Sequence, residues 1–167
     1  MTGIRIGIVG GIALSVVLFV SASTGWAQGA DPWIGTWRLN TAKSTFSPGP
    51  PPRSNTLKIE AVSAGAQKHT FDGMNAQGQT THSERIGKFD GTEVPVQAVQ
   101  PPSQASATSA FRRLDSRSFE VVNKSDGKLT STVRVVISAD GKTMTQTQSG
   151  TNAQGQKANN ISLYDKQ

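Results

Sequence analysis

The sequence predicts an all-β protein, an antiparallel up-and-down meander closed into a small barrel of about 8–10 strands and preceded by an N-terminal signal helix. Three observations support this prediction. An apolar leader opens the chain, turn-forming pairs such as Asp-Gly recur at short intervals after it, and runs rich in Thr, Val and Ile lie between those turns.

The first 27 residues have the pattern of a secretory signal peptide. Arg5 precedes the apolar run 6–20, and the small residues Gly25 and Ala27 suit the −3 and −1 positions of a cleavage site after Ala27. The run is about 15 residues long, shorter than the roughly 20 that a membrane-spanning helix needs. We therefore expect a signal peptide at 1–27, a single domain at 28–167, a mature form that does not span the membrane, and a periplasmic or secreted destination.

Composition narrows the classes of partner. The chain has no cysteine, so it has neither a disulfide nor a lipid anchor on an acylated cysteine. Lys and Arg number 17 against 11 acidic residues, a net charge of +6. An exported basic protein meets anionic lipids and glycans rather than nucleic acid, and most of these positive charges are scattered singly, as on a solvated surface.

The turns divide the chain into hairpins. Asp-Gly pairs occur at 72–73, 90–91, 126–127 and 140–141. The pentapeptide NAQGQ occurs at 75–79 and 152–156, with Asn at position i and Gly at position i+3 of a type I turn. Because the match between the two flanks ends soon after the pentapeptide, repeated use of a good turn explains it better than a duplicated domain.

Strand-like runs fill the intervals at 57–62, 119–122, 129–137, 143–149 and 160–164. One face of the run 129–137 carries Leu129, Ser131, Val133, Val135 and Ile137. A helical turn is expected within 40–46, and the proline-rich segments 47–53 and 95–109 are expected to be loops or edge coverings. The up-and-down order favours a closed barrel over a sandwich, since closure removes exposed edges.

The opening of the mature chain, Trp33 to Ser44 (WIGTWRLNTAKS), resembles the Gly-x-Trp first strand of lipocalin-like, calycin-type barrels, as found in small secreted bacterial proteins. The resemblance implies that Trp37 closes one end of the barrel. The chain end, ISLYDK, is similar in rhythm to fatty-acid-binding barrels, which usually carry a carboxylate-binding Arg two residues before the Tyr. Here that position is Ser162, so only Tyr164 carries over. Lipocalins also place a late basic residue on the opening Trp, and no Arg follows Arg134.

Two histidines flank the first NAQGQ turn. If that turn centres between Ala76 and Gln77, His69 lies opposite Glu84, and His69, His82 and Glu84 share one face. Such a set could hold zinc, but a one-residue slip of register would separate it. Exposed polar residues are the default interpretation, so we predict no metal and no cofactor.

Ligand candidates are few. Arg85, Arg112 and Arg134 lie on expected strands, and Arg112, on the same side as Ala110 and Leu114, is the preferred cation for an anionic ligand, although an exterior arginine is the simpler alternative. Tyr164 and Trp37 are the aromatic candidates. No nucleophile elbow, catalytic cysteine or phosphate-binding loop is present, so we predict no enzyme.

Two functions remain open. The first is an exported barrel that binds a small apolar or anionic amphipathic ligand, which requires an interior cavity of a few hundred Å³. The second is an envelope-associated interaction protein whose barrel is filled with side chains and whose basic surface contacts anionic polymers or another protein.

Overall fold

The computed structural model describes residues 31–151 and 155–167. The expected signal helix and the cleavage site after Ala27 lie outside the described residues, as does part of the second NAQGQ copy. Within the described ranges no helix has the length and apolarity needed to cross a membrane.

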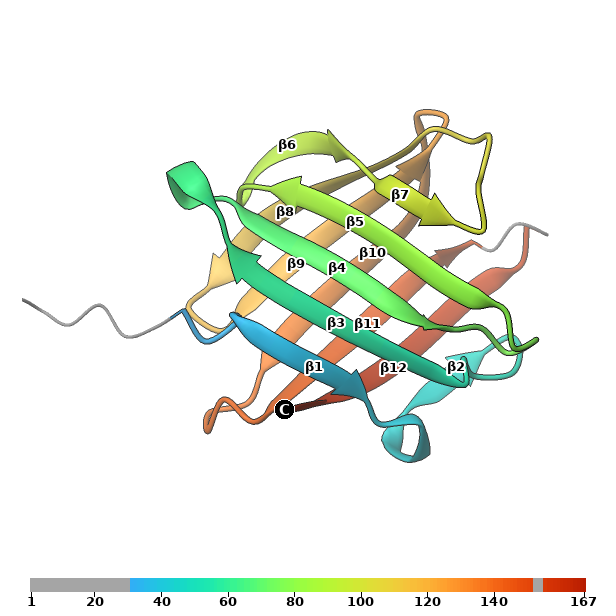
Figure 1. Ribbon diagram of the computed structural model, residues 1–167, viewed down its shortest axis with the longest axis horizontal. Helices are drawn as coiled ribbons and strands as arrows, with labels where there is room; N and C mark the ends of the chain where they lie inside the picture. Colours follow the sequence, from blue (N-terminus) through green and yellow to red (C-terminus); the bar gives the residue numbers. More distant parts are fainter. Residues whose placement is uncertain (1–30, 152–154) are drawn as a thin grey trace, which may run out of the picture.

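One antiparallel sheet contains twelve described strands and curls into a nearly closed barrel (Figure 1). The strands are β1 (Gly35–Leu39), β2 (Thr45–Ser47), β3 (Ser54–Ala61), β4 (Gln67–Met74), β5 (Thr80–Gly87), β6 (Asp90–Pro95), β7 (Gln97–Gln100), β8 (Ala107–Asp115), β9 (Ser118–Ser125), β10 (Lys128–Ile137), β11 (Thr143–Thr151) and β12 (Lys157–Lys166). Two 3-10 turns, η1 (Thr41–Lys43) and η2 (Ser63–Gly65), complete the described elements. The predicted all-β meander is confirmed, whereas the predicted strand number was too low.

The additional strands lie where proline suggested loops. The strands β6 and β7 form a bent segment whose first half pairs with β8 and whose second half pairs with β5. Pro95 is tolerated because it is the last residue of β6, where one missing N–H does little to the ladder. This segment brings the two ends of the sheet together, so the chain around Pro95 contributes to closure. The loop predicted at 47–53 is largely confirmed, since it follows the short strand β2 on the edge of β12.

Several of the turns predicted from Asp-Gly and NAQGQ are present in the structure. Gly78 N donates to Asn75 O at 3.0 Å, so the first NAQGQ copy forms the expected i to i+3 turn. Asp126 and Gly127 both have positive φ and connect β9 to β10. In contrast, Asp72 and Gly73 lie inside β4, where the prediction of a turn was wrong.

The strands that precede the two NAQGQ copies share a glycine in a close contact. A side chain at Gly73 would lie 2.4 Å from Ser54 O, and one at Gly150 would lie 2.2 Å from Thr130 O. Each glycine therefore lets a neighbouring strand approach closely, two residues before the Asn of its NAQGQ copy.

We call the end of the barrel at which β1 begins, on the left of Figure 1, the tryptophan end. Trp33 and Trp37 are completely buried there, and Trp33 meets Phe119 edge to face at 4.6 Å between ring centroids. The other buried apolar residues at this end are Ile59, Phe111, Ile137 and Met144. The opposite end, which we call the mouth, carries the β4–β5 turn and the loop 48–52 (Figure 1).

The inward face of β10 departs from simple alternation. Ser131, Val135 and Ile137 are buried, but Leu129 is 63% exposed. The register with β9 shifts between Leu129 and Ser131, and this bulge turns Leu129 outward. The prediction that Leu129 lies on the same face as Ser131, Val135 and Ile137 was therefore wrong.

Candidate ligand cavity

A cavity of about 250 Å³ occupies the barrel interior between the tryptophan end and the mouth. Apolar side chains, including Leu57, Phe111 and Phe119, line it together with polar side chains from β3, β4, β5, β9, β11 and β12. The barrel is therefore not filled by its own side chains, unlike many small barrels.

The most unusual group at the cavity is the guanidinium of Arg85 on β5. Its Nη1 donates to Ser109 Oγ at 3.0 Å and to Asn123 Oδ1 at 3.2 Å, and the guanidinium carbon lies 4.7 Å from the ring centroid of Phe71. Its Nε is buried and has no hydrogen-bond acceptor among the described residues. None of the described carboxylates forms an ion pair with it. Arg85 is thus a cation inside the barrel that lacks an anionic partner in the described part of the chain.

Electrostatics at the cavity reflect this arrangement. Burial lowers the pKa of Arg85 to about 10, against a smaller opposing effect of Tyr164, so the guanidinium is still charged at neutral pH. The residue keeps some accessible surface because it borders the cavity. A guanidinium has five N–H donors in a planar fork, and only some of them are occupied here.

His69 lies directly opposite Arg85 in the β4–β5 pair and is 3% exposed. Burial, with Arg85 adding to it, lowers the pKa of His69 to about 3, so its imidazole is neutral at physiological pH. Gln67 Nε2 donates to Asp31 Oδ2 at 2.8 Å, which leaves Gln67 Oε1 to face His69 Nε2 at 3.3 Å. In this assignment His69 carries its proton on Nε2.

Tyr164 on β12 borders the same cavity and is 3% exposed. Burial raises the pKa of its phenol to about 12, with Arg85 opposing the shift. The phenol therefore stays protonated and can both donate and accept a hydrogen bond.

The cavity extends to the mouth. Phe46 and Pro52 line the cavity and also an outer groove formed with Pro48 to Pro50 and Asn75 to Gln77. The proline-rich loop and the β4–β5 turn thus line a groove that adjoins the cavity.

The predicted ligand residues lie in three different places. Tyr164 lines the cavity, whereas Trp37 is buried at the tryptophan end, where its Nε1 donates to Trp33 O at 2.9 Å. The late basic residue next to this Trp is Lys166, whose Nζ lies 4.9 Å from the Trp37 ring centroid. We looked for an arginine at this place in the sequence, and the structure has a lysine. Arg112 points outward, 66% exposed and bonded to Glu120, and does not line the cavity.

The structure does not bring His69, His82 and Glu84 together. The β4–β5 turn is centred on Gln77, so His69 pairs with Arg85 and His82 pairs with Asp72, a register one residue away from the expected one. That slip sends His69 inward and leaves His82 and Glu84 on the outer face. Across residues 31–151 and 155–167 no cluster of three metal-ligating side chains occurs.

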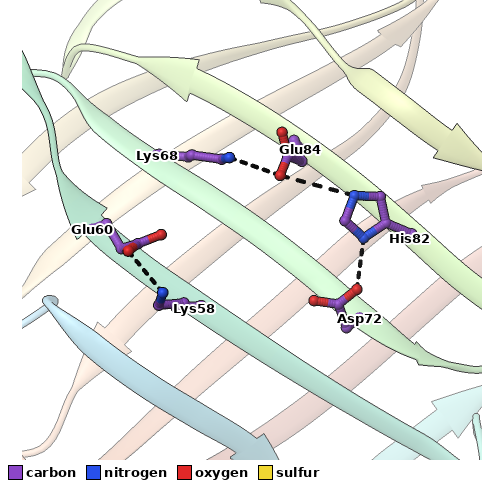
Figure 2. A network of polar contacts seen from close by, with 6 residues as sticks. All are labelled: Lys58, Glu60, Lys68, Asp72, His82 and Glu84. Carbon is purple, nitrogen blue, oxygen red and sulfur yellow. Dashed lines mark hydrogen bonds and ion pairs between the residues drawn. The ribbon is translucent and has the colours of Figure 1, made fainter.

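The outer face of β3, β4 and β5 carries a polar network instead (Figure 2). His82 Nδ1 lies 2.6 Å from Asp72 Oδ1, and Lys68 Nζ lies 2.7 Å from Glu84 Oε1. The partly exposed ion pair between Lys68 and Glu84 is of a kind that contributes little to stability.

Sequence reasoning named Arg85 among three arginines but preferred Arg112. The distinguishing signal is the register of the first hairpin, because Arg85 points inward only if it lies opposite His69. A five-residue turn, Asn75–Gln79, produces that register, and Asn75 N donating to Gln79 O at 2.9 Å closes it.

Comparison with known proteins supports the fold. No family model matches the chain, and none of the curated proteins matches it. Among solved structures it is similar to the crystal structure of a point mutant of the fluorescent protein UnaG, with a TM-score of 0.51, 15% identity, and coverage of 81% of this chain and 96% of that one. At this identity the likeness shows a calycin-like barrel and nothing finer.

Proposed function

We propose that this protein binds a small anionic molecule inside its barrel, with the acid group held by Arg85. The main support for this proposal is the Arg85 guanidinium, which borders a cavity of about 250 Å³ and has no carboxylate partner among the described residues. A buried cation is costly unless it is paired, so an anion supplied by a ligand is the group that this site lacks.

The cavity also favours interior binding over the alternative of a filled barrel that acts through its basic surface. That alternative needs no interior space and no interior cation. The calycin-like fold agrees with ligand binding as an analogy. We further propose, from the leader pattern of residues 1–27, that the mature protein acts in the periplasm or after secretion.

Isothermal titration with a matched pair, cyclohexanecarboxylate and the neutral cyclohexanecarboxamide, tests the proposal. The acid should bind at least about tenfold tighter than the amide, because charge-assisted hydrogen bonds to a guanidinium contribute roughly 1.5–3 kcal/mol. Arg85→Met should abolish that preference.

Arg112→Met is the matched control, since it removes an exposed arginine that does not line the cavity. It should leave the preference for the acid unchanged. Equal binding of acid and amide to the wild type, or an acid preference that survives Arg85→Met, would overturn the proposal.

A further inference from the structure

The wall of the cavity changes character along the barrel. Along β3 and β9 the inward lining residues change towards the mouth, from Leu57 to Asn55 and from Phe119 and Val121 to Asn123. The polar lining residues on β3, β9, β11 and β12 are Asn55, Asn123, Gln146, Gln148, Ser162 and Tyr164. A ligand with a purely apolar body would bury these groups without replacing their bonds to water.

Some of these polar groups are already bonded to the protein. Asn123 accepts from Arg85 and Ser109 and donates to Ser131, and Gln148 accepts from Asn160. These bonds hold the wall in place and leave little capacity for a ligand.

Four other polar groups at the cavity form no such hydrogen bond within the described ranges. Asn55 Oδ1 is buried and lacks a donor among the described residues. Gln146 and Ser162 lie opposite each other on β11 and β12, and within the described ranges their side chains, like the Tyr164 hydroxyl, form no hydrogen bond. A buried polar atom without a partner, such as Asn55 Oδ1 among the described residues, is rare in native proteins and indicates a water or ligand that completes it.

We propose that the anion held at Arg85 is a polyhydroxylated acid of the sugar-acid or hydroxycyclohexane-carboxylate class, whose hydroxyls bond Asn55, Gln146, Ser162 and Tyr164. This inference rests on the proposed function. A hydroxyl suits every one of these groups because it both donates and accepts, so it would satisfy the Asn55 amide in either orientation. The apolar side chains Leu57 and Phe71 offer a surface for the C–H face of such a molecule.

Size agrees with this class. A volume of about 250 Å³ is close to that of about eight waters at about 30 Å³ each, and it falls below the range of typical drug-sized sites. A compact acid with on the order of a dozen non-hydrogen atoms fits this space better than a long-chain lipid.

Isothermal titration with quinate and cyclohexanecarboxylate separates the ligand classes, since the two acids share a ring and differ in hydroxyl groups. Wild-type protein should bind quinate at least about tenfold tighter, because a site built to bond hydroxyls rejects the analogue that lacks them. Asn55→Leu should reduce the affinity for quinate about 5–10-fold and leave that for cyclohexanecarboxylate unchanged. Thr56→Val, an outward neighbour on β3, is the control and should change neither affinity.

Folding of the variant is checked by its melting temperature without ligand, which should stay the same or rise, because Leu replaces an unpaired buried acceptor. Arg85-dependent binding of cyclohexanecarboxylate as tight as that of quinate would overturn this inference while leaving the proposed function intact. Failure of both acids to bind in an Arg85-dependent way would overturn the proposed function and this inference together. An unchanged quinate preference in Asn55→Leu would overturn the assignment of the hydroxyl site.

Discussion

Buried His69 predicts a specific loss of stability in mild acid. Its pKa is about 3 in the folded protein, lowered mainly by burial, against 6.5 as the ordinary value. Because the folded pKa is the lower one, the unfolded chain takes up a proton first, and stability falls as pH drops below about 6.5. Between pH 7.5 and pH 5.0 this linkage amounts to about 2 kcal/mol.

Measurements between pH 7.5 and pH 5.0 separate the effect of His69 on stability from that of the carboxyl groups. Asp90, Asp115 and Asp140 have lowered pKa values, so the stability that they contribute is lost only at more acidic pH. Urea denaturation followed by tryptophan fluorescence suits the measurement because Trp33 and Trp37 are both buried. His69→Gln should reduce the pH-dependent loss by about 2 kcal/mol relative to wild type. His82→Gln, on the outer face, is the control; equal pH-dependent losses in wild type and His69→Gln would refute the burial argument.

Three further measurements test the packing and the site. Gly73→Ala should lower the free energy of unfolding by about 2–3 kcal/mol, because its Cβ would clash with backbone. Gly141→Ala, at a turn with open space, is the control and should lower it by about 1 kcal/mol. Equal losses of stability in urea denaturation would contradict this prediction. Lys166→Met should cost about 1 kcal/mol through loss of its contact with the Trp37 ring and its bond to Pro32 O, with Lys157→Met as a near-neutral control; a thermal melt that does not separate the two would count against the contact. Arg85→Met should leave the melting temperature of the ligand-free protein unchanged or raised, and a large decrease would show that Arg85 is needed for folding.

Local chemistry was sufficient to predict much of this fold. Asp126-Gly127 and the turn from Asn75 to Gly78 formed as expected because their conformations depend on a few adjacent residues. The helical turn expected after the first strand is η1, and Asn40 Oδ1 caps it by accepting from Lys43 N at 3.2 Å.

Features set by pairing with distant strands could not be predicted in the same way. The pair Asp72-Gly73 signals a turn in isolation, yet the close approach of β3 makes it part of a strand. Likewise, the outward position of Leu129 depends on a bulge against β9, and Lys166 reaches Trp37 only because β12 pairs with β1. The site residue Arg85 belongs with these, since a single residue of register decided whether it faced the cavity or solvent.

Arg85 also bears on why the barrel is built unevenly. With no cysteine in the chain, stability has to come from apolar burial, and the completely buried residues Trp33, Trp37 and Met144 all lie towards one end. A buried cation lowers stability unless its environment compensates for it, and Ser109, Asn123 and the Phe71 ring do so only in part. The buried apolar residues of the barrel offset this cost, so the cavity can keep the two polar atoms that have no partner among the described residues, Arg85 Nε and Asn55 Oδ1. Among the described residues, Arg85 Nε and Asn55 Oδ1 are buried at the cavity without a hydrogen-bond partner, and their presence is explained more readily by binding than by folding.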